Sequence, residues 1–367
     1  MNNRLSGWQF AFMLYLVPFG SALVFLTGSV ASQNAWISTL IGACFGLYVL
    51  YAIFKIHDLY PGQRITQIST EVLGKIPGTI LNWFWFLGIF VILITFLFDM
   101  IMLMEIIYPF LPRVILCPLL ILPCCYCLYK GINVLGRLGE ITIVIVILVS
   151  TLGFILAVPI VDLSKLEPLR HSWRSIIAGA VYAADWPFDE IIIFALFLPF
   201  VANLQKIKSR AFFGFLMCAS VLTQTDIIII AVQGAELADL SLFPLYSASR
   251  LIGFENFQRV ELLFFFVWLF TGVYTILVYY QGVNFIVQDL FFLKDYRPLI
   301  LPLGLCIIVF TLYMFPNTVE YTLLGFKYLE VYTFPMNLLY PTIILVAAQY
   351  RYKRRKVSGA SAIDARR

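Results

Sequence analysis

The stretch AADWPFDEIIIF, residues 183–194, places a proline and three acids inside an apolar segment: Asp185, Pro187, Asp189 and Glu190. Proline has no backbone N–H and interrupts an α-helix. A charged side chain at the centre of a membrane helix costs about 2.5–3.5 kcal/mol on insertion scales. We therefore expect a broken helix whose acids serve a ligand or an ion pathway. The alternative is a structural helix start, in which acids after a proline interact favourably with the helix dipole.

The composition of the whole chain is that of a multi-span membrane protein. Of its 367 residues, 62% are hydrophobic and 12% are charged, with a mean hydropathy of +0.93. Soluble domains are about 45–50% apolar and about 25% charged. A membrane helix needs about 20 mainly apolar residues, and this rule gives ten spans. They are Trp8–Thr27, Trp36–Phe54, Ile80–Tyr108, Val114–Tyr129, Ile141–Ile160, Ile176–Phe200, Ala211–Val232, Leu262–Leu290, Leu299–Phe315 and Met336–Tyr350.

The first span contains a motif that resembles the one in the sixth. LVPFGSAL, residues 16–23, and DWPFDEII, residues 185–192, both carry Pro-Phe near the middle of their span. Five spans separate the two prolines, so the two segments cross the membrane in opposite directions. Interrupted spans at matching positions in two halves are typical of inverted-repeat transporters. We predict an all-α, ten-helix, 5+5 inverted repeat with broken helices 1 and 6. The transmembrane domain covers 1–350, with repeats at about 8–160 and 176–350, and a basic tail follows at 351–367.

The distribution of Lys and Arg predicts the orientation. Eighteen of the 25 fall on the side of the two termini and seven on the other, which predicts that both termini are cytoplasmic. Apolar residues recur at helical spacing in 65–76, which indicates a short helix on the cytoplasmic face. The outer loop 233–261 is expected to pack on the outer mouth. The cluster RYKRRK, residues 351–356, either touches anionic lipid or only flanks the last span.

Enzymatic and metal chemistry find no support in the sequence. All seven cysteines lie in apolar segments, and the two histidines, His57 and His171, lie in predicted loops. A metal site would need histidines or paired CxxC motifs, so buried thiols acting as small hydrophobes explain the cysteines. No Gly-rich phosphate loop, HExxH motif or Ser-His-Asp constellation is apparent. We expect a non-enzymatic protein without a metal or a cofactor.

The broken helices predict a site for a zwitterion. In the first span, the N–H groups of Gly20 and Ser21 would bind a carboxylate, and the acids of the sixth would bind an ammonium group or a cation. A polar stripe in the eighth span either lines a cavity or hydrogen-bonds a neighbouring helix. The predicted ligand-binding residues are Val17, Pro18, Phe19, Gly20, Ser21, Thr95, Phe98, Asp99, Ala184, Asp185, Pro187, Asp189, Glu190, Thr271, Tyr274, Thr275 and Tyr279.

Two further acids lie within predicted spans. Glu105, near the end of the third span, is expected to be interfacial. Asp226, in the seventh, is either a buried acid with satisfied hydrogen bonds or part of a proton path.

Several local patterns resemble one family. They are LSGWQFAFML near the start, EVLGKIPG at 71–78, GINVLGRLGEI at 131–141, WPFDEIIIFALFLPF at 186–200 and FQRVELLFFFVW at 257–268. In this order they resemble the B subunits of the nutrient germinant receptors of bacterial endospores. These form the spore permease-like branch of the amino acid–polyamine–organocation superfamily.

The resemblance implies a LeuT-like fold that senses a small germinant, often an amino acid. It also implies an A-type membrane subunit and a C-type lipoprotein as partners, in the spore inner membrane. By analogy the site lies between spans one, three, six and eight. The other reading is an amino acid permease driven by protons or cations.

The acids after Pro187 are given separate roles. Asp189 and Glu190 are adjacent, so they lie about 100° apart around a helix and cannot point the same way. The family usually shows a Pro-Phe-Gly-Glu-like run, in which Asp189 here replaces the glycine. We expect Glu190 to be the structural or gating acid and Asp189 to tune which ligand is accepted.

Overall fold

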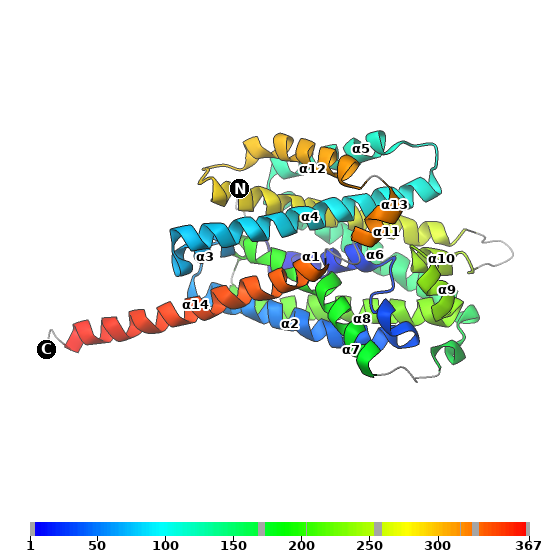
Figure 1. The fold of residues 1–367 in the computed structure, drawn as a ribbon, viewed down its shortest axis with the longest axis horizontal. Helices are drawn as coiled ribbons and strands as arrows, with labels where there is room; N and C mark the ends of the chain where they lie inside the picture. The colour runs from blue at the N-terminus through cyan, green and yellow to red at the C-terminus, as the bar shows by residue number, and fades with distance from the viewer. Residues whose placement is uncertain are drawn as a thin grey trace.

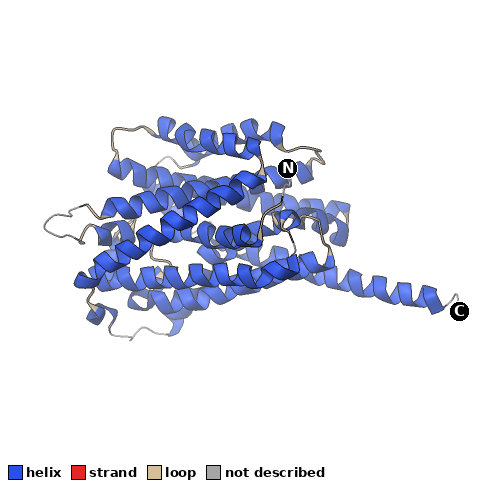
Figure 2. Ribbon diagram, turned by 180° about the vertical axis from the view of Figure 1, so that it is seen from behind, coloured by secondary structure: helices blue, strands red, loops and turns tan. Residues whose placement is uncertain are grey.

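The computed structural model describes residues 4–167, 173–202, 204–252, 259–315, 317–324 and 330–364. Within these ranges the regular structure is helical, and the only strand-like pairing is an isolated bridge between Leu5 and Val201. Most helices run along one common direction and form a bundle (Figures 1 and 2). Helix α14 projects beyond the bundle toward the C-terminus (Figure 1). The prediction of an all-α membrane protein is confirmed for the described residues.

The regular segments follow one another along the chain in this order. The α-helices are α1 (Gly7–Ala22), α2 (Ala35–Leu59), α3 (Ile65–Leu73), α4 (Lys75–Ile107), α5 (Arg113–Lys130), α6 (Ile132–Ala157), α7 (Trp173–Ala183), α8 (Leu204–Gln233), α9 (Ala235–Leu240), α10 (Pro244–Ser249), α11 (Glu261–Leu290), α12 (Ile300–Met314), α13 (Thr318–Leu324) and α14 (Glu330–Asp364). The shorter helical segments, tight 3-10 helices except for the wide π turn η4, are η1 (Ser29–Asn34), η2 (Val158–Ile160), η3 (Leu163–Leu166), η4 (Ala184–Phe188), η5 (Asp189–Leu196), η6 (Leu198–Phe200) and η7 (Arg297–Leu299).

Seven helical stretches in the described residues are long and apolar enough to cross a membrane. They correspond to the predicted spans two, three, four, five, seven, eight and nine. The other three predicted spans coincide with α1, which has 16 residues, with the segment from α7 to η6, which is interrupted, and with α14, which carries the basic tail. The membrane class is therefore clear, and the number of ten spans stays a prediction.

Helix α1 begins with a capping box and runs without a break past Pro18. The Ser6 hydroxyl accepts from the N–H of Gln9 at 3.1 Å, and the Gln9 side chain accepts from the N–H of Ser6 at 2.8 Å. The break expected at Pro18 is wrong: α1 ends at Ala22, and the chain turns between Leu23 and Gly28. One proline removes one donor, and membrane helices tolerate it where neighbouring helices pack around them.

Close packing against α11 fixes the end of α1. A Cβ atom on Gly20 would lie 2.5 Å from the Thr275 hydroxyl oxygen and 2.6 Å from the Thr271 carbonyl oxygen. The Thr275 hydroxyl also donates to the Val17 carbonyl at 3.2 Å. Small residues allow membrane helices to approach this closely. Gly20 therefore serves the contact between α1 and α11.

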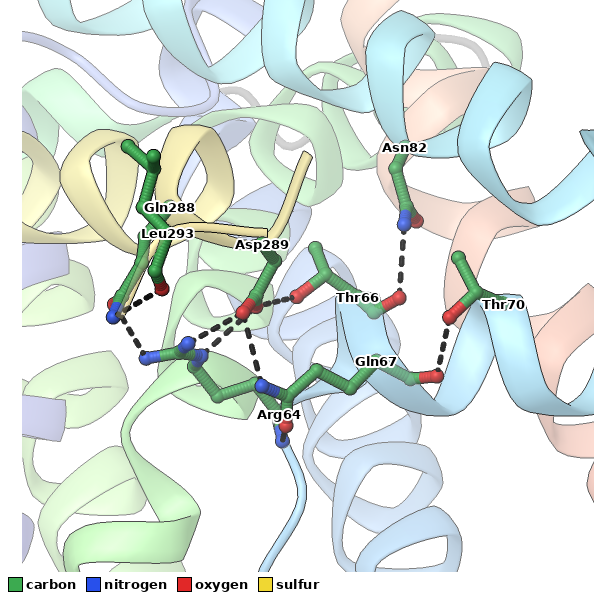
Figure 3. Close-up of polar contacts among 8 residues, drawn as sticks. All are labelled: Arg64, Thr66, Gln67, Thr70, Asn82, Gln288, Asp289 and Leu293. Atoms are coloured by element: carbon green, nitrogen blue, oxygen red, sulfur yellow. Dashed lines mark hydrogen bonds and ion pairs between the residues drawn. The ribbon is translucent and has the colours of Figure 1, made fainter. Parts of the chain in front are cut away.

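An ion pair anchors α3 at one end of the bundle, which we call the α3 end. Arg64, just before α3, pairs with Asp289 on α11, and their side chains are 10% and 7% exposed (Figure 3). Asp289 also accepts from Thr66 and from Gln67, the latter at 2.9 Å, and the Arg64 guanidinium lies 4.9 Å from the centre of the Phe285 ring. The expected amphipathic helix is thus present and held by buried charge.

Two hydrogen bonds, one from the Asn82 amide and one from the Tyr340 hydroxyl, extend this anchor into the bundle. The Asn82 side chain on α4 donates to the Thr66 carbonyl at 2.8 Å (Figure 3). The Tyr340 hydroxyl on α14 donates to the other end of Asn82 at 2.7 Å. Helix α3 is therefore connected to α11, α4 and α14 together.

The connection after α8 packs at the opposite end, the α10 end. The N–H of Leu245 donates to the Val24 carbonyl at 3.1 Å, just after α1. The Phe243 ring lies between those of Phe25 and Trp268, with centroids 5.3 and 6.1 Å apart. The described part of the loop 233–261 packs on the bundle, as expected, and that this end is the outer mouth stays a prediction. Residues 253–258 lie outside the described residues, as does His171.

The anchor of α3 leads to a stability prediction. Asp289→Asn should lower the free energy of unfolding by about 3–5 kcal/mol, because it leaves the Arg64 charge buried without its counter-ion. Asp295→Asn is the matched control, since it removes a carboxylate whose pair with Arg297 is about half exposed and is worth about 0–1 kcal/mol. Thermal unfolding of the purified protein in detergent measures both. Equal melting temperatures for the two variants would contradict the structural role of the pair.

The contact between α1 and α11 gives a second prediction. Gly20→Ala should destabilise the protein by about 1–3 kcal/mol or more, because the added methyl group meets the backbone of α11. Gly88→Ala is the control: its Cβ would lie 3.5 Å from the Tyr332 ring, an ordinary contact, and alanine favours a helix. Size-exclusion profiles and melting temperatures of the two variants test this. A stable Gly20→Ala variant would show that the two helices are not in this contact.

Candidate functional site

The sixth apolar segment is broken between Ala183 and Asp189, within the stretch AADWPFDEIIIF. Helix α7 ends at Ala183, and a wide turn, η4, begins at the fully buried Ala184. Within it Trp186 is extended, with φ −140° and ψ 121°, and the bond to Pro187 is cis. A tight helix, η5, begins at Asp189. The predicted helix break in this segment is confirmed.

The three acids around the break face two different helices. The Thr333 hydroxyl on α14 donates to Asp185 at 3.0 Å, and the Asn337 amide, one turn later on α14, donates to Asp189 at 3.2 Å. The Ser21 hydroxyl at the end of α1 donates to Glu190 at 2.9 Å. The adjacent acids Asp189 and Glu190 therefore point to opposite partners, as their positions in the sequence require.

The acids form a cluster of buried carboxyl groups without a basic partner. Their exposures are 5%, 1% and 3% for Asp185, Asp189 and Glu190. Among the described residues, no Lys, Arg or His forms an ion pair with them. One oxygen of Asp189 and the hydroxyl of Tyr279 are buried without a hydrogen-bond partner, and Tyr279 lies near all three acids. Such open hydrogen-bonding capacity fits a proton, a cation or an ammonium group.

The α1 residues of the predicted site divide between two roles. Ser21 reaches the acids, and it also donates to the Pro18 carbonyl at 3.1 Å. Phe19 is buried and stacks on Tyr15 with ring centroids 5.3 Å apart. Gly20 and Ser21 lie inside α1, not after a break, so the expected free N–H groups for a carboxylate are not available there. This part of the predicted zwitterion site is therefore wrong, because α1 is continuous through Gly20 and Ser21.

The α11 residues also divide. Thr271 donates to carbonyl groups of its own helix, and Thr275 donates to α1. The Tyr274 hydroxyl donates to the Leu135 carbonyl of α6 at 3.1 Å. Thr275 and Tyr274 therefore bond to neighbouring helices, the second of the two alternatives left open by the polar stripe, whereas Thr271 bonds within α11. Tyr279 is the member of the stripe that lies near the acids.

The α4 residues form a separate polar contact. The Tyr321 hydroxyl on α13 donates to Asp99 at 2.5 Å, and the Tyr321 ring lies 4.6 Å from that of Phe98. Thr95 donates to the Ile92 carbonyl of its own helix. Asp99 lies near Glu190, so this contact is a neighbour of the acid cluster, although no hydrogen bond joins Asp99 to Glu190.

Glu105 and Asp226, the two further acids within predicted spans, both have hydrogen-bond partners. Arg113 donates to both oxygens of Glu105, at 2.7 and 2.9 Å. Asp226 accepts from the N–H of Thr27 at 3.1 Å and from the Thr39 hydroxyl at 2.5 Å. Asp226 thus holds the turn after α1, which favours a satisfied structural acid over a proton path.

Sequence reasoning missed the two partners on α14. Thr333 and Asn337 are four residues apart and so share one face of the helix. The predicted tenth span began at Met336 and left Thr333 outside it. Two polar residues at i and i+4 on an apolar helix were the available signal.

The comparisons with known proteins agree with this architecture. The chain is 26% identical over 362 residues to spore germination protein KB of Bacillus subtilis (strain 168), covering 97% of each chain. Its fold matches that of MhsT in complex with L-phenylalanine, with a TM-score of 0.64, 13% identity and coverage of 93% of this chain and 87% of that one. It also matches Mhp1, a nucleobase-cation-symport-1 family transporter, with a TM-score of 0.61, 11% identity and coverage of 96% and 94%.

A third solved structure extends the range of these transporters. A Na⁺-coupled sialic acid symporter matches with a TM-score of 0.64 at 10% identity, covering 96% of this chain and 90% of that one. Identities this low show the fold alone, and that fold and the family indicate a non-enzymatic membrane protein. The family described as "Spore germination protein" matches residues 4–320. The chain therefore belongs to the spore permease family of spore germination proteins.

Proposed function

We propose that the protein is the nutrient-sensing subunit of a spore germination receptor and binds a small germinant at the acid cluster. The observation that carries the proposal is the group of three buried carboxyl groups at the break of the sixth segment. They have Thr333, Asn337 and Ser21 as partners but no basic residue within ion-pair distance among the described residues. A positively charged group on the ligand would complete this site.

An amino acid is the first candidate for the ligand. Its ammonium group would lie between Asp185 and Asp189, where one Asp189 oxygen and the Tyr279 hydroxyl have no hydrogen-bond partner. The match to MhsT in complex with L-phenylalanine supports an amino acid. Mhp1 and the sialic acid symporter bind other compounds on the same fold, so the charge of the site is the stronger guide.

The proposal includes the membrane arrangement and the partners. Ten spans in two inverted repeats of five would place α1 and the segment from α7 to η6 at matching positions. The broken segment meets the continuous α1 through the bond from Ser21 to Glu190. Both termini would be cytoplasmic in the spore inner membrane, with the basic tail at 351–367 following the transmembrane domain. An A-type membrane subunit and a C-type lipoprotein would complete the receptor, by resemblance to the family.

A second candidate is an amino acid permease coupled to cations or protons. The unpaired carboxyl groups favour it, because a coupled transporter needs a buried group that takes up and releases a cation or a proton. The fold match to a Na⁺-coupled symporter also supports it. Binding and uptake of one radiolabelled ligand, measured on the same reconstituted protein, separate the two: a receptor binds without uptake.

The orientation gives a direct prediction. In a background without the seven native cysteines, Lys294→Cys at the α3 end should react with a membrane-impermeant thiol reagent only from the cytoplasm. Leu240→Cys, at the tip of α9 and 79% exposed, should react only from the outside. The reason is the excess of Lys and Arg on the side of Lys294. The reverse labelling pattern would invert the topology.

The acids give the functional prediction. Glu190→Gln should impair the response to every ligand, because it weakens the bond that joins η5 to α1. Asp189→Gly, which restores the family-like residue, should change ligand preference and preserve assembly. Germination of spores on a panel of amino acids and sugars measures the response, with protein levels checked in spore membranes.

Ligand analogues and a control variant sharpen this test. An amine that lacks the carboxylate should still compete for binding to the purified protein, whereas the deaminated acid should not. Leu47→Ile, a conservative change at a partly buried position of α2, should leave the response unchanged. If Asp189→Gly leaves the panel unchanged while Glu190→Gln only shifts preference, the two roles are reversed. Competition by the deaminated acid alone would refute an ammonium site.

A further inference from the structure

A cavity of about 450 Å³ lies between α3 and α14 at the α3 end of the bundle. None of its lining residues is a hydrogen-bond partner of Asp185, Asp189 or Glu190. Val72 of α3 lines one side, and Ala347, Tyr350, Arg351 and Arg354 of α14 line the other. Volumes of this order are typical of small-molecule sites. The lining combines two guanidinium groups with an apolar floor.

The two arginines keep much of their hydrogen-bonding capacity. One nitrogen of Arg351 donates to the Glu71 carbonyl at 2.7 Å, which ties α14 to α3. The Arg354 guanidinium lies over the Tyr350 ring, 4.6 Å from its centre. Neither arginine forms an ion pair with a carboxylate of the described residues. A guanidinium group binds a phosphate through two parallel N–H donors.

The apolar part of the cavity lies beside the charged part. Val72 is 3% exposed and belongs to the buried face of α3, while the two arginines directly follow the apolar part of α14. A phosphate group at the arginines would therefore have apolar surface next to it at the membrane boundary. This order of groups matches a phospholipid, whose phosphate is joined to its acyl chains through the glycerol.

We propose that the cavity between α3 and α14 binds an anionic phospholipid, with its phosphate at Arg351 and Arg354 and its chains toward Val72 and Ala347. Basic pockets between membrane helices are a known form of lipid recognition. Free phosphate shares the charge but cannot use the apolar floor. The site belongs to the membrane-bound chain itself and does not depend on which germinant the acid cluster accepts.

The wall formed by α3 is fixed before a lipid arrives. The pair of Arg64 with Asp289 and the chain of contacts through Thr66, Asn82 and Tyr340 hold α3 against the bundle (Figure 3). A preformed wall reduces the ordering that binding requires. A lipid in the cavity would add a contact between α3 and α14 to the one from Arg351.

The test measures lipid binding to the purified full-length protein. The melting temperature is followed in neutral detergent while dioleoylphosphatidylglycerol is titrated, and dioleoylphosphatidylcholine and inorganic phosphate form two further arms. Arg354→Gln should weaken the phosphatidylglycerol effect about fivefold or more, because a neutral amide cannot replace the two parallel N–H bonds from a guanidinium group to the phosphate. Ala347→Phe should weaken it without changing the charge, because the ring fills the apolar floor.

Lys353→Gln is the matched control. It removes one positive charge from the neighbouring position of the same helix, exposed and outside the cavity lining, and should keep the affinity unchanged. Arg354→Gln melting without lipid shows whether the variant is folded, and Arg354→Lys, which keeps the charge but loses the fork, should fall between the two.

Three results would overturn the proposal. Equal weakening by Lys353→Gln and Arg354→Gln would show a general attraction to the basic tail. An equal response to phosphatidylcholine would show that the phosphatidylglycerol charge is not recognised. Stabilisation by inorganic phosphate that Arg354→Gln abolishes and Ala347→Phe does not would assign the arginines to a free anion.

Discussion

A carboxyl group buried in an apolar medium must find its hydrogen-bond partners within the protein. This constraint governs the sixth segment, where α7 ends at Ala183, Trp186 is extended, and three acids lie around the break. Each acid has a different partner: Thr333 and Asn337, one turn apart on α14, bond to Asp185 and Asp189, and Ser21 on α1 bonds to Glu190. The positions of α1, α14 and the broken segment are therefore determined by one another, and the site exists only where all three meet.

Two regions of the protein solve the problem of buried charge in different ways. At the α3 end, Asp289 is matched by Arg64 and by further donors, so the charge is neutralised and the helices are held. At the acid cluster, no such cation is present among the described residues, and the hydrogen-bond partners Ser21, Thr333 and Asn337 are neutral. The first arrangement stabilises a structure. The second leaves a demand for positive charge, which is the property expected of a place that a ligand occupies and leaves.

The features that depend on local chemistry could be predicted from the sequence. Pro187 with three acids indicated the helix break, the spacing of Ile65, Ile68 and Val72 indicated α3, and the apolar runs indicated the spans. The features that depend on which distant surfaces meet could not. Pro18 resembles Pro187 in its sequence context, yet α1 continues past it because neighbouring helices enclose it. The face of α11 that carries Thr275 meets α1 and not a cavity, and neither periodicity nor composition contains that information.

The hydrogen bonds from α14 to the acids also constrain the order in which the protein is synthesised and folds. Each joins residues 148 positions apart in the chain, and the donors belong to the last helix. A ribosome therefore delivers the broken segment to the membrane well before Thr333 and Asn337 are synthesised. During that interval Asp185 and Asp189 must be neutralised by protons, kept near water or sheltered by the insertion machinery. The synthesis and packing of α14 thus supply the hydrogen bonds that Asp185 and Asp189 lack until then.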